Sequence, residues 1–108
     1  MFCASVAYPA QPGGRFDFAY FAHTYVPLFA RLLGANCVRF EVQRPLTTPG
    51  APPPAYQGVA HFWVQAGEEF GSALEQHGPE IYADIPRFTD IEPVRYWSEV
   101  VSQEEGAP

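Results

Sequence analysis

Two histidines and one tyrosine are the candidates for acid, base or hydrogen-bond chemistry in this chain. His61 lies within an apolar strand pattern, where an imidazole is either hydrogen-bonded structure or a poised base. His77 closes the inward face of a helical pattern, and Tyr25 falls in the middle of an apolar helical stripe. If all three converge between sheet and helices, His61 would act as base while Tyr25 and His77 hold an oxyanion. Strand alternation does not say which sheet face His61 occupies, and on the far face the group does not form.

Helical phase separates Tyr25 from the nearby His23. At about 100° per residue His23 points away from the apolar stripe, so we expect it in solvent. A tyrosine with a pKa near 10 is a poor base at neutral pH but a serviceable hydrogen-bond donor. Pro27 cannot donate to the carbonyl of His23, so we expect a kinked helix that leaves a cleft over the sheet.

Four aromatic side chains are predicted to bind the substrate. They are Phe21, Trp63, Phe70 and Tyr82. No metal is predicted, because His61 and His77 have no close third ligand of a known pattern. The chain has no glycine-rich phosphate loop and no Gly-x-Ser-x-Gly elbow, and we expect no cofactor.

Charge excludes several classes of function. Twelve acidic residues stand against six arginines and no lysine, a formal charge of -6. This balance argues against a nucleic-acid partner, and the missing lysine removes Schiff-base chemistry.

No apolar run approaches a membrane span and no signal peptide is evident, so we expect a cytoplasmic protein without a membrane partner. Cys3 and Cys37 are expected to be free thiols.

The elements that must position these residues follow the order strand, helix, strand, strand, helix, strand. Strands are predicted over residues 2–8, 36–46, 56–65 and 90–100. The first helix is predicted over residues 17–33, with Asp17 as N-cap and Gly34 as C-cap. The second helix is predicted to start near Gly67 and to be interrupted at Gly78 and Pro79, before a short turn over residues 80–85. The proline-rich residues 47–55 are predicted to form an exposed connection.

This order predicts an α+β, ferredoxin-like fold with an antiparallel sheet and helices on one face. Residues 1–101 form the single predicted domain, and residues 102–108 a flexible acidic tail. The strands carry apolar residues on both sides, so the second sheet face is expected to pack on another copy. The predicted assembly is a homodimer that forms a dimeric α/β barrel.

Three segments of the chain resemble the EthD family. They are Phe16-Asp17 with Tyr20-Phe21, Thr24 and Pro27-Leu28; Gly58-x-x-His61-Phe62; and Asp84-Ile85-Pro86-Arg87-Phe88-Thr89-Asp90-Ile91-Glu92-Pro93. The resemblance implies the same fold and dimeric barrel. It links the chain to a gene neighbourhood named for degradation of ethyl tert-butyl ether, and not to a demonstrated reaction. Proteins that share the barrel include polyketide cyclases and cofactor-independent or haem-using monooxygenases.

The chain departs from the family pattern at one position of the first helix. There the family usually reads Tyr-Tyr-x-x-x-His-x-Pro-Leu, and Tyr25 stands in place of the histidine. The resemblance therefore implies no helix base in this chain. Arg87 also stands where the family often has Asn, while His61 and His77 look like the family's own positions.

Three functions are consistent with these residues. The first is a cofactor-independent enzyme, cyclase-like or monooxygenase-like, that moves a proton on a small apolar or aromatic ketone-like ligand. The second is a non-catalytic accessory protein that binds such a ligand for a xenobiotic or ether degradation pathway. The third is a haem-binding protein of the monooxygenase type, with His77 as ligand. Turnover that survives His61→Ala would argue against the first.

Overall fold

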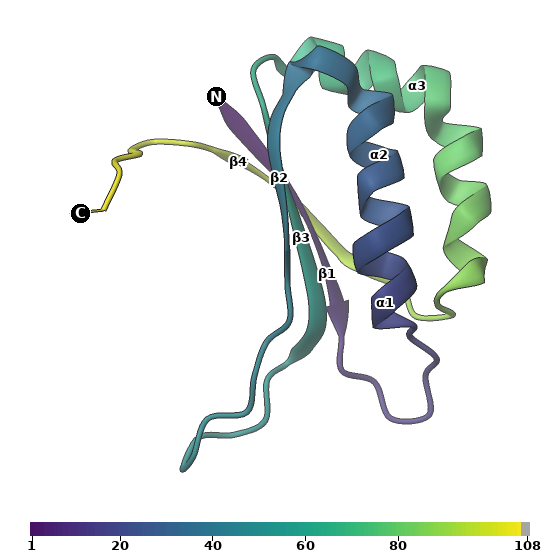
Figure 1. Ribbon diagram of the computed structural model, residues 1–108, viewed down its shortest axis with the longest axis vertical. Coiled ribbons are helices and arrows are strands. Elements are labelled where there is room, and N and C mark those ends of the chain that lie inside the picture. Colours follow the sequence, from purple (N-terminus) through teal and green to yellow (C-terminus); the bar gives the residue numbers. More distant parts are fainter. Residues whose placement is uncertain (107–108) are drawn as a thin grey trace.

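The computed structural model describes residues 1–106 and contains one antiparallel sheet with its helices packed on a single face (Figure 1). The strands lie in the order β2-β3-β1-β4, so β3 and β1 are central. This topology confirms the predicted ferredoxin-like α+β fold. The strands are β1 (Phe2–Pro9), β2 (Cys37–Gln43), β3 (Tyr56–Val64) and β4 (Val94–Glu99).

The first helical segment runs without a break through α1 (Phe18–Tyr20), the π-helical turn η1 (Phe21–Tyr25) and α2 (Val26–Leu33). Asp17 caps it as predicted, because its carboxylate accepts the backbone N–H of Tyr20 at 3.1 Å. The left-handed φ of 68° at Gly34 ends it.

Pro27 is preceded by the wide π-helical turn η1, which changes the hydrogen-bond pattern of the helix at this point. The N–H of Val26 bonds to the carbonyl of Phe21, five residues back. The missing N–H of Pro27 is therefore accommodated by one extra residue in the turn, which is a usual way for a helix to absorb such a defect. The predicted disturbance is present, but as a π turn.

The second helix contradicts one prediction. Helix α3 (Gly67–Asp84) passes through Gly78 and Pro79 and continues into the 3-10 turn η3 (Ile85–Arg87). The predicted interruption is therefore wrong. Ile81, two residues after the proline, is 1% exposed in the core, and packing of this last part of the helix offsets the cost of an interior proline.

Two strands are shorter than predicted. The last strand begins at Val94, because Asp90 bonds to Arg15 instead of continuing the sheet: its N–H donates to the carbonyl of Arg15 at 3.3 Å, and its carboxylate accepts the N–H of Arg15 at 2.7 Å. The second strand ends at Gln43, and residues 44–55 form the expected exposed connection, which projects beyond the sheet (Figure 1). Residues 101–106 carry no helix or strand, and residues 107 and 108 of the predicted tail lie outside the described part of the chain.

The core lies between the helices and the even-numbered side chains of the two central strands. Its largest members below 2% exposure are Tyr8, Phe21, Phe62, Phe88, Ile81, Val26 and Val64. The opposite sheet face is not covered by any described element; we call it the open face (Figure 1). None of the helices in residues 1–106 is both long and apolar enough to cross a membrane.

Candidate functional site

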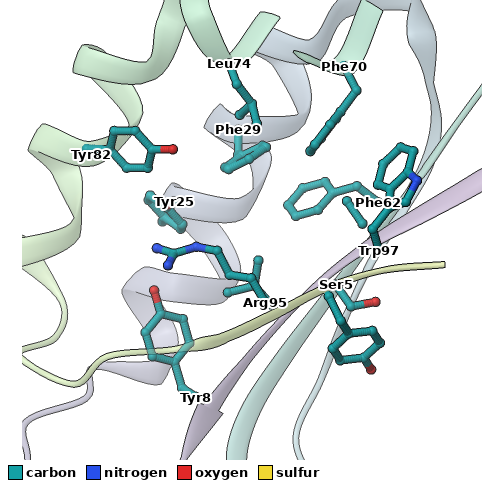
Figure 2. Close-up of a pocket in the computed structure, with 13 residues that line it drawn as sticks. Ser5, Tyr8, Tyr25, Phe29, Phe62, Phe70, Leu74, Tyr82, Arg95 and Trp97 are labelled. Atoms are coloured by element: carbon teal, nitrogen blue, oxygen red, sulfur yellow. The ribbon is translucent and has the colours of Figure 1, made fainter. Parts of the chain in front are cut away.

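A cavity of about 280 Å³ lies between the helices and the β1–β4 side of the sheet (Figure 2). Helix α3 and strand β4 form its walls, the central strands its floor and the first helical segment its inner end. Among the described residues, no Asp, Glu or His lines it. The lining residues are Ala4, Ser5, Val6, Tyr8, Tyr25, Phe29, Phe62, Phe70, Leu74, Tyr82, Arg95, Tyr96 and Trp97.

The cavity exists because two bulky side chains hold α3 away from the edge strand. Phe70 of α3 meets Trp97 of β4 with ring centroids 5.1 Å apart, and Trp97 stacks on Phe2 at 5.2 Å. Behind these rings, Ala4 and Val6 of β1 are too short to fill the space below the helix. Phe70 and Leu74 remain only half-buried although they face the sheet. Such an apolar hollow is typical of a small-molecule site.

Tyr25 reaches the inner end of the cavity from the π turn. Its side chain is 5% exposed, and burial raises its pKa well above the ordinary value of 10. Burial likewise raises the pKa of Tyr8 to about 12. Both phenols therefore stay protonated at neutral pH, and each offers an O–H donor and no useful base.

Phe88 positions Tyr25, and the segment that follows α3 positions Phe88. The rings of Phe88 and Tyr25 lie 4.7 Å apart. The carbonyl of Phe88 accepts the N–H of Asp17 at 2.7 Å, and the hydroxyl of Thr89 donates to the carbonyl of Arg15 at 2.7 Å. These bonds fasten the chain before the first helix to the chain after the second. The most specific segment of the sequence resemblance therefore holds one end of the cavity together.

Asp84 strengthens the same connection. The hydroxyl of Tyr20 donates to Oδ1 of Asp84 at 2.8 Å, and the guanidinium of Arg87 lies 3.6 Å from that oxygen. The second carboxylate oxygen of Asp84 is buried without a hydrogen-bond partner among residues 1–106. Asp84 does not line the cavity.

Arg95 is a cavity residue that sequence reasoning missed. It pairs with Val6 across β1 and β4, which puts it on the helix side of the sheet together with Trp97. Strand alternation in residues 94–99 groups Arg95 with Trp97. The sequence therefore showed that Arg95 and Trp97 share one sheet face. It did not show whether that face or the face of Val94 and Tyr96 meets the helices.

Three of the seven predicted site residues line the cavity, and they are Tyr25, Phe70 and Tyr82. Phe21 is fully buried in the core beneath them. His77 lies farther along α3, with Nδ1 3.9 Å from a carboxylate oxygen of Glu80. The remaining two, His61 and Trp63, are on the open face.

The structure therefore does not bring His61, His77 and Tyr25 together. Phe62 stacks on Phe29 of the helix layer at 4.7 Å, so its strand neighbour His61 must point to the opposite side. The catalytic roles given to the two histidines stay predictions. The geometry gives neither of them a place in the cavity, and this includes the haem-ligand role of His77.

His61 forms a small polar cluster on the open face. Its Nδ1 lies 2.7 Å from the hydroxyl of Ser5 and 3.8 Å from the sulfur of Cys3. Burial lowers the pKa of His61, and the carboxylate of Glu41 on the neighbouring strand opposes this. A neutral imidazole bonded to a buried hydroxyl is a usual structural arrangement.

Trp63 lies beside this cluster. The guanidinium of Arg39 is 4.2 Å from the ring centroid of Trp63, and Arg39 also contacts Glu41 at 3.2 Å. Cys3 and Cys37 are free thiols, as expected. Within residues 1–106, no group of three or more His, Cys, Asp or Glu side chains is placed to hold a metal ion.

Comparison with known proteins gives three informative structures. An EthD-like protein from Ralstonia eutropha JMP134 is 37% identical, with 95% of this chain and 94% of that chain covered and a TM-score of 0.87. A mutant form of SnoaB from Streptomyces nogalater, a cofactor-independent oxygenase, is 14% identical over 94% of this chain and 92% of its own, with a TM-score of 0.60. A dimeric ferredoxin-like protein from an uncultured marine organism is 12% identical over 98% of this chain and 100% of its own, at a TM-score of 0.61. The last two likenesses show the fold alone. No family model and no curated protein matches the sequence.

Proposed function

Because this chain belongs to the family of EthD-like proteins, we propose that it binds a small apolar or aromatic molecule in the cavity between α3 and β4. The observation that carries the proposal is the cavity itself, which is walled by aromatic and aliphatic side chains and open to solvent. A cavity of about 150 Å³ lined by apolar groups already binds benzene. The 280 Å³ here is therefore enough space for a substituted aromatic ring.

The chemistry of the lining supports binding better than acid–base catalysis. Within the described chain, the cavity offers phenol donors and one guanidinium but no carboxylate or imidazole. A reaction that removes a proton from the ligand would have to rely on the acidity of the ligand itself. A non-catalytic binding protein is therefore the first proposal, and cofactor-independent chemistry on an acidic ligand is the alternative.

A crystallographic experiment with an iodinated ring tests the binding proposal. We expect 4-iodobenzamide soaked into crystals to place its iodine in the cavity, where anomalous scattering locates it. Leu74→Trp fills the cavity from α3 and should abolish binding, whereas Gln76→Trp, on the exposed side of the same helix, should not. Iodine found only outside the cavity, or binding that survives Leu74→Trp, would contradict the proposal.

We further propose that two copies associate through the open face. Val94 and Tyr96 of β4 are 43% and 50% exposed on this side. The half-buried Trp63 lies on the same face, on β3, with β1 between the two strands. Apolar exposure of this kind on a sheet face is a usual mark of an interface. One ferredoxin-like neighbour is described as dimeric, which supports the association of two copies. A dimeric α/β barrel would follow from two sheets that meet face to face.

A further inference from the structure

Arg95 brings a positive charge into an otherwise uncharged cavity. Figure 2 shows its guanidinium directed toward Tyr25 and toward the hydroxyl of Tyr8, while Tyr82 lies beyond Tyr25. The side chain comes from the edge strand β4 and is held on this face by the pairing of Arg95 with Val6. The charge therefore lies where the aromatic walls end and the phenol groups begin.

This guanidinium has no acidic partner in the part of the chain that the structure describes. The ion pairs there use Arg39, Arg87 and His77. The chain carries twelve acidic residues against six arginines, so partners are plentiful in general. Glu92 and Arg95 both act on the phenol of Tyr8, with opposite sign, but the two form no ion pair. An arginine left without a carboxylate in an acidic protein is available to an anion from outside.

The tyrosines add hydrogen-bond donors beside the same charge. The guanidinium is close enough to the Tyr8 and Tyr25 phenols to oppose the rise of their pKa values. Because both phenols stay protonated, their O–H groups complement an acceptor that carries negative charge. A cation and neutral donors directed into one space form the usual surroundings of a bound oxygen anion.

The rest of the cavity selects a flat ring. Phe29 of the inner end and Phe62 of the floor stack with centroids 4.7 Å apart, and Phe70 and Trp97 pack on each other in the wall, 5.1 Å apart. Aromatic walls of this kind favour planar ligands through offset stacking and edge contacts. The ring and the anion-binding end lie in one continuous cavity.

We propose that the ligand is a planar aromatic molecule with an anionic oxygen group, a carboxylate or an enolate, bound by Arg95 beside Tyr8 and Tyr25. This inference rests on the proposed binding function and specifies the class of ligand that the cavity accepts. It makes Arg95 the residue that determines specificity, while the aromatic walls supply affinity for any ring. The same surroundings would stabilise the charge of an ionised ligand, which is the form that the alternative, cofactor-independent function needs.

Two probes of equal shape test this inference. These are 4-iodobenzoate and its neutral counterpart 4-iodobenzamide, titrated calorimetrically into the wild-type chain. We expect the carboxylate to bind about tenfold more tightly, the ratio expected for one charge-assisted contact at a partly open site. Arg95→Gln should weaken iodobenzoate about tenfold and leave iodobenzamide within about twofold, whereas Arg95→Lys should keep part of the preference.

The controls separate failure of the inference from failure of the proposed function. Arg31→Gln removes an exposed arginine of α2 that does not line the cavity, and it should change neither affinity. If wild type binds iodobenzamide as tightly as iodobenzoate, or if Arg95→Gln weakens both equally, the anionic class is wrong and the cavity function stands. If wild type binds neither probe, both proposals fail. Thermal unfolding of each variant at an unchanged midpoint shows that the fold is retained.

Discussion

Phe88→Ala is expected to destabilise this protein strongly. The ring of Phe88 is 0% exposed and has five other aromatic rings within 4.7 to 6.1 Å. Truncation of a buried phenylalanine costs about 3–5 kcal/mol. The loss of several aromatic pairs adds to that value, because each contributes about 0.5–1.5 kcal/mol beyond buried area.

A loss of this size is a large part of the stability of a small domain, which is about 5–15 kcal/mol. It corresponds to a fall of at least about 12 °C in the unfolding midpoint for a chain of this length. The cavity should also change, since Tyr25 loses the ring that packs on it at 4.7 Å. We therefore expect Phe88→Ala to lose affinity for 4-iodobenzamide even at a temperature where it remains folded.

Urea unfolding followed by circular dichroism measures the effect, with Phe40→Ala as matched control. Phe40 is 43% exposed on β2, so the same truncation should cost about 1 kcal/mol or less. The midpoint should shift while the slope of the transition is retained. If Phe88→Ala cost no more than Phe40→Ala, the claim that the buried aromatic contacts of Phe88 stabilise the core would be refuted.

Four smaller predictions follow from individual groups. Asp17→Ala should cost about 1 kcal/mol in urea unfolding through loss of the helix cap; Asp17→Asn should recover most of it, and no recovery would argue against capping. The raised pKa of Tyr8, about 12 against an ordinary 10, means that the unfolded chain ionises first above pH 10. Stability should therefore fall as pH rises through that window, and Tyr8→Phe should reduce the slope by up to about 1.4 kcal/mol per pH unit; an unchanged slope counts against burial of the phenol. The lowered pKa of His61 has the opposite sense, so stability should be lost as pH falls below about 6.5, and less so in His61→Gln. Nuclear magnetic resonance titration of the folded chain measures the pKa of His61 directly, and a value above the ordinary 6.5 would contradict this prediction. Val94→Asp on the open face should convert a dimer into a monomer in light scattering, whereas the exposed Tyr82→Asp on α3 should not; a wild-type monomer at micromolar concentration would reject the dimer.

Helix starts, strand alternation and topology could be predicted from the sequence because each depends on local spacing. Asp17 and Gly34 cap the first helix where expected, and Tyr25 faces inward while His23 is exposed. The alternation in β3 places His61 and Trp63 on the opposite sheet face from Phe62, as regular strand geometry requires. The break at Pro79 was predicted from a local cost and is wrong because burial of Ile81 outweighs it.

The site was harder to predict from the sequence, because the alternation of side chains along a strand does not tell which sheet face is covered by helices. Alternation groups side chains on one face, and the choice of face is made by tertiary packing such as the contact of Phe29 with Phe62. His61 therefore lies outside the expected cluster, and Arg95, which the sequence did not single out, lines the cavity from β4. The hydrogen bond from the hydroxyl of Thr89 to the carbonyl of Arg15 joins residues more than seventy positions apart, and no local sequence pattern predicts such a contact.

The two tryptophans allow a direct test of the central claim, because Trp97 lines the cavity and Trp63 lies on the open face. The iodine of 4-iodobenzamide quenches an indole only when the two are in close contact. In Trp63→Phe, where Trp97 is the single tryptophan, we predict saturable quenching with the affinity measured by calorimetry. In Trp97→Phe, which keeps Trp63, we predict only a weak, linear collisional effect. Saturable quenching of Trp63, or linear quenching of both, would contradict binding in the cavity between α3 and β4.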